Sequence, residues 1–347
     1  MASPAQVAQE VCGVQAQDLP AALLSIRARS AGLTASGVEQ ARQIERSIAW
    51  TWCLRGTLHL ISAEDARWMV PLLGAGLIAA GRRRFEQLGW DDESVATGMR
   101  LLQDSLGVHG GLTRAEITQL LKANGLPWEG QAPVHLLYRA TLEGLICMGP
   151  NRGTQPTYVL FERWLGEPLP LPRQAALEKI TCRYLEAYGP ARPQDLAGWS
   201  GLRIGEAREA WRLVADRLVQ VEVAGQPAWL LKTRLPWMDE LSESGPVVRL
   251  LPRFDTYLLG YANRDLAVDP AFAKRIHPGG GIIQAALLVD GEALGTWKTR
   301  RHGRHLEVTV APFVGLSEQL FPQIEAEVAD LGRFLGGEAV LIMKAPT

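Results

Sequence analysis

The chain has 347 residues, of which 47% are hydrophobic and 21% charged, and its formal net charge is −1 at pH 7. This composition is that of a folded globular protein and excludes a chain that is mainly disordered. Apolar runs are too short for the roughly 20 residues of a membrane-spanning helix, and the start lacks the basic and apolar regions of a signal peptide. We therefore expect a cytoplasmic protein without membrane contact, built from two or three units.

The basic residues and cysteines set further limits. The near-neutral net charge gives no global sign of a nucleic-acid partner. Arginine nevertheless outnumbers lysine by 30 to 6. GC-rich coding or selection for planar contacts with phosphate would each explain this bias, and both explanations stay open. The four cysteines, Cys12, Cys53, Cys147 and Cys182, are scattered, so we expect no disulfide framework, no metal site and no cofactor.

The first predicted unit, residues 1–95, is helical and then turns to strand. Helices are predicted at 3–12, from Asp18 to about 32, and at 38–47. Two short strands follow within 48–61, on either side of Arg55 and Gly56. The next stretch, 62–88, is predicted as a pair of helices that begins at a Ser62 cap.

The second and third predicted units share one pattern of helix, turn, helix and hairpin. In the second, residues 96–166, a capping box from Thr113 to Glu116 starts a helix that stops at Gly125. A helix with Pro133 near its start and a strand-turn-strand segment follow. The third, residues 172–236, repeats this order after a proline-rich linker. Helix-turn-helix plus hairpin is typical of a winged helix, and the first unit is its most diverged copy.

The last predicted region, residues 237–347, is rich in strands. Hairpins are predicted at Asp290-Gly291 and His302-Gly303, followed by a helix within 316–336 and a final strand. The predicted fold class is therefore α+β, with three tandem winged-helix units and a β-rich C-terminal part.

Gln15 and Gln17 lie between two predicted helices. On a helix their side chains would diverge, whereas in an extended turn both amides point to the same side and can converge on one ligand. The alternative is that they cap helix ends or meet solvent. Asp18 is first of all a helix N-cap, and a catalytic role is secondary.

A basic cluster lies on the hairpin of the C-terminal region: Lys298, Arg300, Arg301, His302, Arg304 and His305. Local positive charge on a neutral chain suits a confined DNA contact. The alternative is an exposed hairpin kept soluble by arginine. The same two interpretations, phosphate contact or solvated face, apply to Arg82, Arg83 and Arg84. Asp255, Tyr257 and Tyr261 either line a cleft or, for the tyrosines, belong to the core.

Four segments together resemble one known family. They are 14–33, 46–68, 250–261 with the following Arg264, and 295–313. In the same order they are similar to the winged-helix DNA glycosylase family typified by AlkZ and YcaQ, over nearly the whole chain. The resemblance implies three tandem winged helices, excision of N-alkylated purines and unhooking of DNA interstrand crosslinks. It makes Gln15-Ala16-Gln17 the glutamine form of the family's active-site motif.

The resemblance also implies roles for other residues. It places the strand with Arg55 and His59 beside the active site and the basic hairpin near the DNA. The alternative for His59 is a wing strand in which a backbone group satisfies the imidazole. A bacterial member would be associated with the nucleoid.

Glutamine chemistry fits such a reaction. An amide cannot act as a general base, but purines alkylated at N3 or N7 are cationic and leave without an acid. The carbonyl oxygens of Gln15 and Gln17 would place a water against C1′ and stabilise the sugar cation. No lysine precedes Lys122, so we expect a monofunctional, monomeric glycosylase acting on double-stranded DNA. The rivals are a non-catalytic winged-helix transcription regulator and a metal-dependent nuclease, which would need clustered carboxylates.

Overall fold

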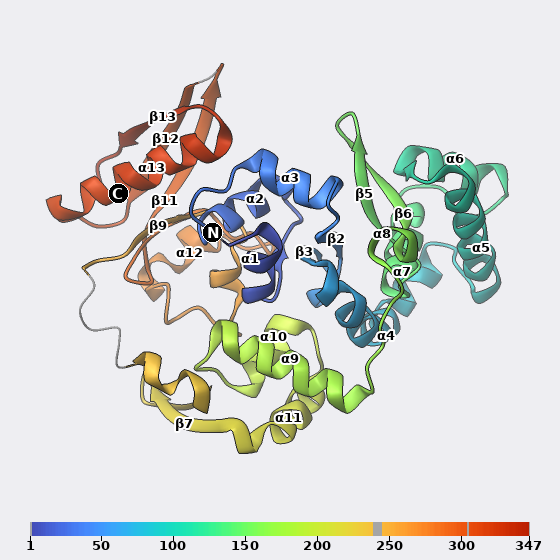
Figure 1. The fold of residues 1–347 in the computed structure, drawn as a ribbon, viewed down its shortest axis with the longest axis horizontal. Coiled ribbons are helices and arrows are strands. Elements are labelled where there is room, and N and C mark those ends of the chain that lie inside the picture. Colours follow the sequence, from blue (N-terminus) through green and yellow to red (C-terminus); the bar gives the residue numbers. More distant parts are fainter. Residues whose placement is uncertain (1, 239–244, 304, 347) are drawn as a thin grey trace.

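The computed structural model describes residues 2–238, 245–303 and 305–346 of the chain. Its mixture of helices and strands confirms the predicted α+β class (Figure 1). The first elements follow the order helix, strand, helix, helix, strand, strand. They are α1 (Pro4–Glu10), β1 (Val14–Gln15), α2 (Leu19–Arg27), α3 (Ala35–Gln43), β2 (Ile48–Trp52) and β3 (Leu58–Ser62).

This order occurs twice more. The second occurrence comprises α5 (Asp92–His109), β4 (Leu112–Thr113), α6 (Arg114–Ala123), α7 (Ala132–Leu142), β5 (Ile146–Arg152) and β6 (Gln155–Leu160). The third comprises α9 (Arg173–Tyr188), α10 (Pro193–Ser200), α11 (Ile204–Leu213), β7 (Leu218–Val223) and β8 (Gln226–Leu231). There an isolated bridge between Ala191 and Trp229 takes the place of the short first strand. The recurrence supports three winged-helix units, whose limits stay a prediction.

Three sequence-based expectations need correction. The segment after Ser62 is one helix, α4 (Ala63–Gln87), and not a pair, although Pro71 lies inside it. Packing between α7 and α9 holds it together, and Gly74 lets the backbone of α7 approach, since a Cβ there would lie 2.1 Å from the Leu142 carbonyl oxygen. Helix α2 ends at Arg27, earlier than expected. Helix α5 was not anticipated, and the expected boundary at residue 95 falls in its first turn.

One sheet joins the first two units. Its strand order is β1-β3-β2-β5-β6-β4, and the bridge between the units pairs Trp50 with Met148. Short helix α8 (Phe161–Leu165) and the predicted linker then lead to the third unit, where β7 and β8 form a separate hairpin. The expected Ser62 cap and Thr113–Glu116 capping box are both present.

The C-terminal part is a second sheet with strand order β13-β12-β11-β10-β9. Its strands are β9 (Val248–Leu251), β10 (Ala286–Val289), β11 (Glu292–His302), β12 (His305–Pro312) and β13 (Glu338–Met343). Helix α13 (Phe321–Leu335) covers one face, and its Ile324 and Leu331 share a core with Val308 of β12 (Figure 1). Short helix α12 (Ala273–Ile276) precedes β10. The hairpin at Asp290-Gly291 is confirmed, and β11 and β12 form the second one, in which His302 pairs with His305 and so lies in the strand.

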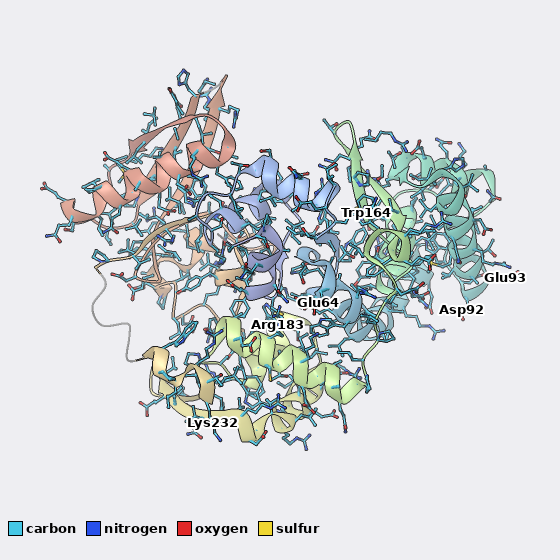
Figure 2. All side chains as sticks on the ribbon, viewed as in Figure 1. Glu64, Asp92, Glu93, Trp164, Arg183 and Lys232 are labelled. Carbon is cyan, nitrogen blue, oxygen red and sulfur yellow. The ribbon has the colours of Figure 1, made fainter. Side chains whose placement is uncertain are left out.

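Buried ion pairs connect parts that are distant in sequence. Arg29, just after the end of α2, contacts Asp255 in the C-terminal part at 2.7 Å. Arg183 of α9 contacts Asp65 of α4 at 2.8 Å, and Figure 2 shows Arg183 beside Glu64 at the start of α4. Together with shared hydrophobic clusters, these contacts fix the units around the first one. Within the described residues, no helix has the length and hydropathy that a membrane crossing requires.

Candidate active site

Gln15 lies in a row of polar side chains across the first sheet. It pairs with His59 of β3, which in turn pairs with Thr51 of β2. Directly opposed residues of antiparallel strands share a face, so the three side chains lie on the same side. The next residue, Ala16, is fully buried in the core of the other face, and its N–H donates to the Leu58 carbonyl at 2.7 Å.

The chain is thus extended through residue 16, the conformation that we expected for convergence of the Gln15 and Gln17 amides. Gln15 is half-buried. Gln17 is exposed and follows Ala16, whose backbone N–H is hydrogen-bonded to β3. A bend begins at Gln17, beyond the extended segment. Convergence of the two amides on one ligand stays a prediction.

Arg55 fixes the orientation of the Gln15 amide. Its Nη2 donates to Oε1 of Gln15 at 2.7 Å, and its Nη1 donates to the Trp199 carbonyl at the end of α10. Arg55 adopts a left-handed backbone conformation, with φ at 54°, in the β2–β3 turn. Gly201 allows this turn to come close, because a Cβ at Gly201 would lie 3.0 Å from Cα of Arg55. Burial lowers the pKa of Arg55, and the nearby charge of Arg264 acts in the same direction.

His59 is neutral at physiological pH. Its side chain is 1% exposed, and Nδ1 lies 3.0 Å from the Thr57 carbonyl oxygen, to which it must donate. Burial, with the charge of Arg55 as a smaller cause, lowers the pKa of His59 to about 3. The imidazole therefore has a backbone partner, as expected if His59 has a structural role. A neutral imidazole cannot serve as a general acid near pH 7.

Asp18 makes the contact expected of a helix cap. Its side chain accepts a hydrogen bond from the Ala21 N–H at 3.2 Å, at the start of α2. This contact occupies one carboxylate oxygen. A catalytic role for Asp18 stays a prediction.

The basic hairpin divides its charges between two faces. Lys298, Arg300 and His302 alternate with Thr299 and Arg301 along β11 and are all exposed. Arg301 pairs with the buried Leu306 on the α13 side, and its Nη2 lies 3.5 Å from the Leu335 carbonyl oxygen. Lys298, Arg300 and His302 therefore face away from α13. Arg304 lies outside the described residues. Figure 1 shows this hairpin and the β5–β6 hairpin pointing to the same side, with α3 between them.

Other candidates have structural partners. Asp255 is fully buried and accepts hydrogen bonds from Ser25 and Arg29, so the expectation that it lines a cleft is wrong. Tyr257 and Tyr261 donate to the carbonyls of Gly291 and Tyr188, as core tyrosines do. Arg82 pairs with Glu86 on the exposed face of α4.

Sequence analysis missed the contribution of α10. The Trp199 carbonyl that holds Arg55 is 144 positions away from it in sequence. A backbone carbonyl carries no residue-type signal, so no motif could have indicated this contact. Arg264 was noticed only as part of the family resemblance, and its place near Arg55 depends on the fold.

Comparison with known proteins identifies the class. The family model described as DNA glycosylase AlkZ-like matches residues 8–334. The chain therefore belongs to the AlkZ-like DNA glycosylase family, as the resemblance predicted. Among individual proteins, the interstrand DNA cross-link repair glycosylase of Streptomyces sahachiroi is 28% identical over 353 residues, covering 96% of this chain and 91% of the relative. The solved structure of Streptomyces sahachiroi DNA glycosylase AlkZ matches with a TM-score of 0.81 at 25% identity, covering 99% of this chain and 94% of that one.

Proposed function

We propose that this protein is a monofunctional, monomeric DNA glycosylase that hydrolyses the N-glycosidic bond of cationic N3- or N7-alkylated purines in double-stranded DNA. Crosslinked purines belong to the same class of leaving group. The observation that carries the proposal is the Gln15 amide held by Arg55 beside a neutral His59. None of these three groups supplies a proton near pH 7, so the leaving base must already carry positive charge.

The glutamines then have separate tasks. Oε1 of Gln15 accepts one hydrogen bond from Arg55, and a carbonyl oxygen keeps a second lone pair for a water. Gln17 is exposed and can turn its own carbonyl dipole toward the sugar cation. Positioning and dipole stabilisation of this kind supply the catalysis once the leaving group is activated.

Family membership and the name of the relative support the crosslink activity. The Streptomyces sahachiroi relative is named for interstrand cross-link repair. A crosslinked N7-alkylguanine is a cationic leaving group like a singly alkylated one. The same chemistry would therefore release one end of a crosslink.

The third helices of the first two units, α3 and α7, argue against a transcription regulator. A winged-helix regulator places such a helix in the major groove. Here Arg42 of α3 is 2% exposed and contacts Glu39 together with the Gly149 carbonyl of β5. In the second unit α7 packs on α4. The inward face of α3 is therefore engaged in contacts between elements, and α7 has no exposed residue with which to read bases.

A matched series of lesions tests the proposal. Purified protein would be incubated with duplexes that contain N7-methylguanine, N3-methyladenine, an N7-linked crosslink, uracil or 8-oxoguanine, and the free base would be measured. We expect release of the cationic bases and none of uracil or 8-oxoguanine. Efficient uracil excision, or no release from any cationic lesion, would contradict the proposal.

Single variants then assign the roles. Gln15→Ala and Gln17→Ala should each lose excision while retaining their melting temperature and DNA binding. Gln103→Ala, an exposed glutamine on α5, is the matched control. Asp18→Asn should retain activity at a stability cost of about 1 kcal/mol or less, because asparagine also caps helices. A stable but inactive Asp18→Asn would move the central role to Asp18.

A further inference from the structure

Two arginines near Gln15 have unusual surroundings. Other arginines that connect parts of the molecule pair with carboxylates: Arg27 with Glu327, Arg29 with Asp255, Arg42 with Glu39 and Arg183 with Asp65. In the part of the chain that the structure describes, Arg55 contacts only the Gln15 amide and the Trp199 carbonyl. Arg264 contacts the Leu258 carbonyl, through Nε at 2.7 Å.

Both arginines belong to segments that pack on α10. Arg55 reaches the Trp199 carbonyl there. The segment before Arg264 packs on the same helix, since the Ala262 N–H donates to Asp195 at 3.0 Å and a Cβ at Gly198 would lie 3.3 Å from Cα of Ala262. The charge of Arg264 also lowers the pKa of Arg55, in keeping with the packing of both segments on α10.

Both guanidiniums are partly removed from water. Both side chains are only partly exposed, and burial lowers the pKa of each, for Arg264 as the only cause. A desolvated charge without a counter-ion is costly, and two such charges of the same sign add repulsion. The proposed reaction would bring a cationic base and a sugar cation to the same place. The site therefore needs an anion when substrate is bound.

We propose that Arg55 and Arg264 bind a backbone phosphate of the damaged DNA strand, next to the nucleotide whose base is released. The proposal rests on the proposed function for the identity of the DNA. Among the described residues, Arg264 makes its hydrogen bond through Nε, so its two terminal nitrogens are available for bidentate contact with phosphate oxygens. The phosphate would neutralise the two arginines, hold the sugar opposite Gln15 and reduce the repulsion of the sugar cation.

This phosphate contact differs from those expected of the hairpin. Lys298 and Arg300 are exposed, so each adds a salt-sensitive contact that lysine or arginine would serve equally. The contact at Arg264 is partly desolvated, and a geometry of two parallel hydrogen bonds favours arginine over lysine.

Neutral backbone substitution tests the proposal directly. Single methylphosphonates would be placed at each of the phosphates around an abasic-site analogue in a duplex, and Kd would be measured for the wild type, Arg264→Gln, Arg264→Lys and the exposed control Arg212→Gln. Binding to an abasic analogue needs no base release, so this measurement stays independent of excision. Melting temperatures would be measured for each variant.

We expect one position at which the methylphosphonate weakens wild-type binding about tenfold, the scale of a hydrogen bond to a charged group. At that position Arg264→Gln should show no further loss, Arg264→Lys a partial loss, and Arg212→Gln the full loss. Equal losses in the wild type and Arg264→Gln at every position would overturn the proposal.

Two further outcomes separate the hypotheses. Absence of base release together with the expected coupling at one phosphate would contradict the proposed function and leave the phosphate site intact. Titration with inorganic phosphate alone tests whether the two arginines bind a free anion and not a DNA phosphate. Saturable binding that Arg264→Gln abolishes, without coupling to any DNA phosphate, would assign the site to a free anion and overturn the DNA contact.

Discussion

At the scale of single residues, the candidate site depends on side chains that are held and not on side chains that titrate. Arg55 is held by its left-handed backbone, by the close approach of Gly201 and by the Trp199 carbonyl. Backbone strain of this kind persists only where the surrounding structure fixes it, and it is concentrated at functional sites. The Gln15 amide acquires a defined direction from this arrangement.

The neutrality of His59 gives a prediction for stability against pH. The unfolded chain binds a proton on this imidazole near pH 6.5, whereas the folded protein keeps it neutral until about pH 3. Acidification between these values therefore favours the unfolded state. Between pH 6.5 and 5 we expect His59 to reduce the free energy of unfolding by about 1.6 kcal/mol, because the unfolded imidazole is already half protonated at pH 6.5 and each further pH unit adds up to about 1.36 kcal/mol.

Urea unfolding at several pH values would measure this loss. His59→Gln should have a flatter dependence of unfolding free energy on pH than the wild type, whatever its stability at pH 7. His109→Gln, a change of an exposed histidine, should retain the wild-type dependence. Equal slopes for the wild type and His59→Gln would show that the imidazole is charged in the folded protein.

At the scale of elements, the basic hairpin gives a prediction about its two faces. Arg300 faces away from α13, and Arg301 lies on the α13 side near the Leu335 carbonyl. Each phosphate contact adds about 0.9 to the slope of log affinity against log salt. Arg300→Ala should therefore flatten this slope by up to about one, and Arg301→Ala should change it less.

Measurement of Kd at four salt concentrations with one undamaged duplex would decide this. Arg83→Ala, on the exposed face of α4, is the matched control for an arginine outside the hairpin. A larger effect of Arg301 than of Arg300 would place the DNA on the α13 side of the hairpin. An effect of Arg83→Ala equal to that of Arg300→Ala would move the DNA contact toward α4.

The elements that could be predicted are those set by local chemistry. The Thr113–Glu116 capping box and the turn at Asp290-Gly291, whose φ values are 51° and 88°, depend on neighbouring residues only. Continuity of α4 through Pro71 depends on packing between α7 and α9, which a local pattern does not contain. Helix α5 had a local signal that was overlooked, the reciprocal capping of Asp91 and Ser94.

The same distinction applies to the candidate site. The cap at Asp18 follows from a residue within three positions. The extended conformation around Gln15 is instead fixed by pairing with His59 of β3, 44 positions along the chain. The bond from Arg55 to Trp199 and the burial of Asp255 under Arg29 join residues more than 100 positions apart. Sequence alone therefore indicated which residues to consider, while the charge balance around them required the fold.

At the scale of the whole molecule, buried ionic contacts join the first unit to its neighbours. Arg29 donates to Asp255 through two hydrogen bonds of 2.9 and 2.7 Å, and the carboxylate is fully buried. Arg27, at 1% exposure, contacts Glu327 and Asp330 of α13. The C-terminal part, which carries the hairpin and the segment around Arg264, thus depends on α2 for its place beside Gln15.

Removal of one partner from such a contact should destabilise the whole protein. Asp255→Asn leaves the guanidinium of Arg29 without its counter-ion and should lower the free energy of unfolding by about 3 kcal/mol, the scale of a broken buried ion pair. Asp104→Asn, on the exposed side of α5, should have almost no effect. Arg29→Met in turn leaves the buried Asp255 carboxylate without its counter-ion. Because each single variant removes the same interaction, the double variant Arg29→Met/Asp255→Asn should lose less than the sum of the two single losses. Urea unfolding followed by tryptophan fluorescence would measure the wild type, both single variants, the double variant and the Asp104→Asn control. A double variant whose loss equals that sum would show that the ion pair does not couple α2 to the C-terminal part, and the shared hydrophobic core would then account for their association.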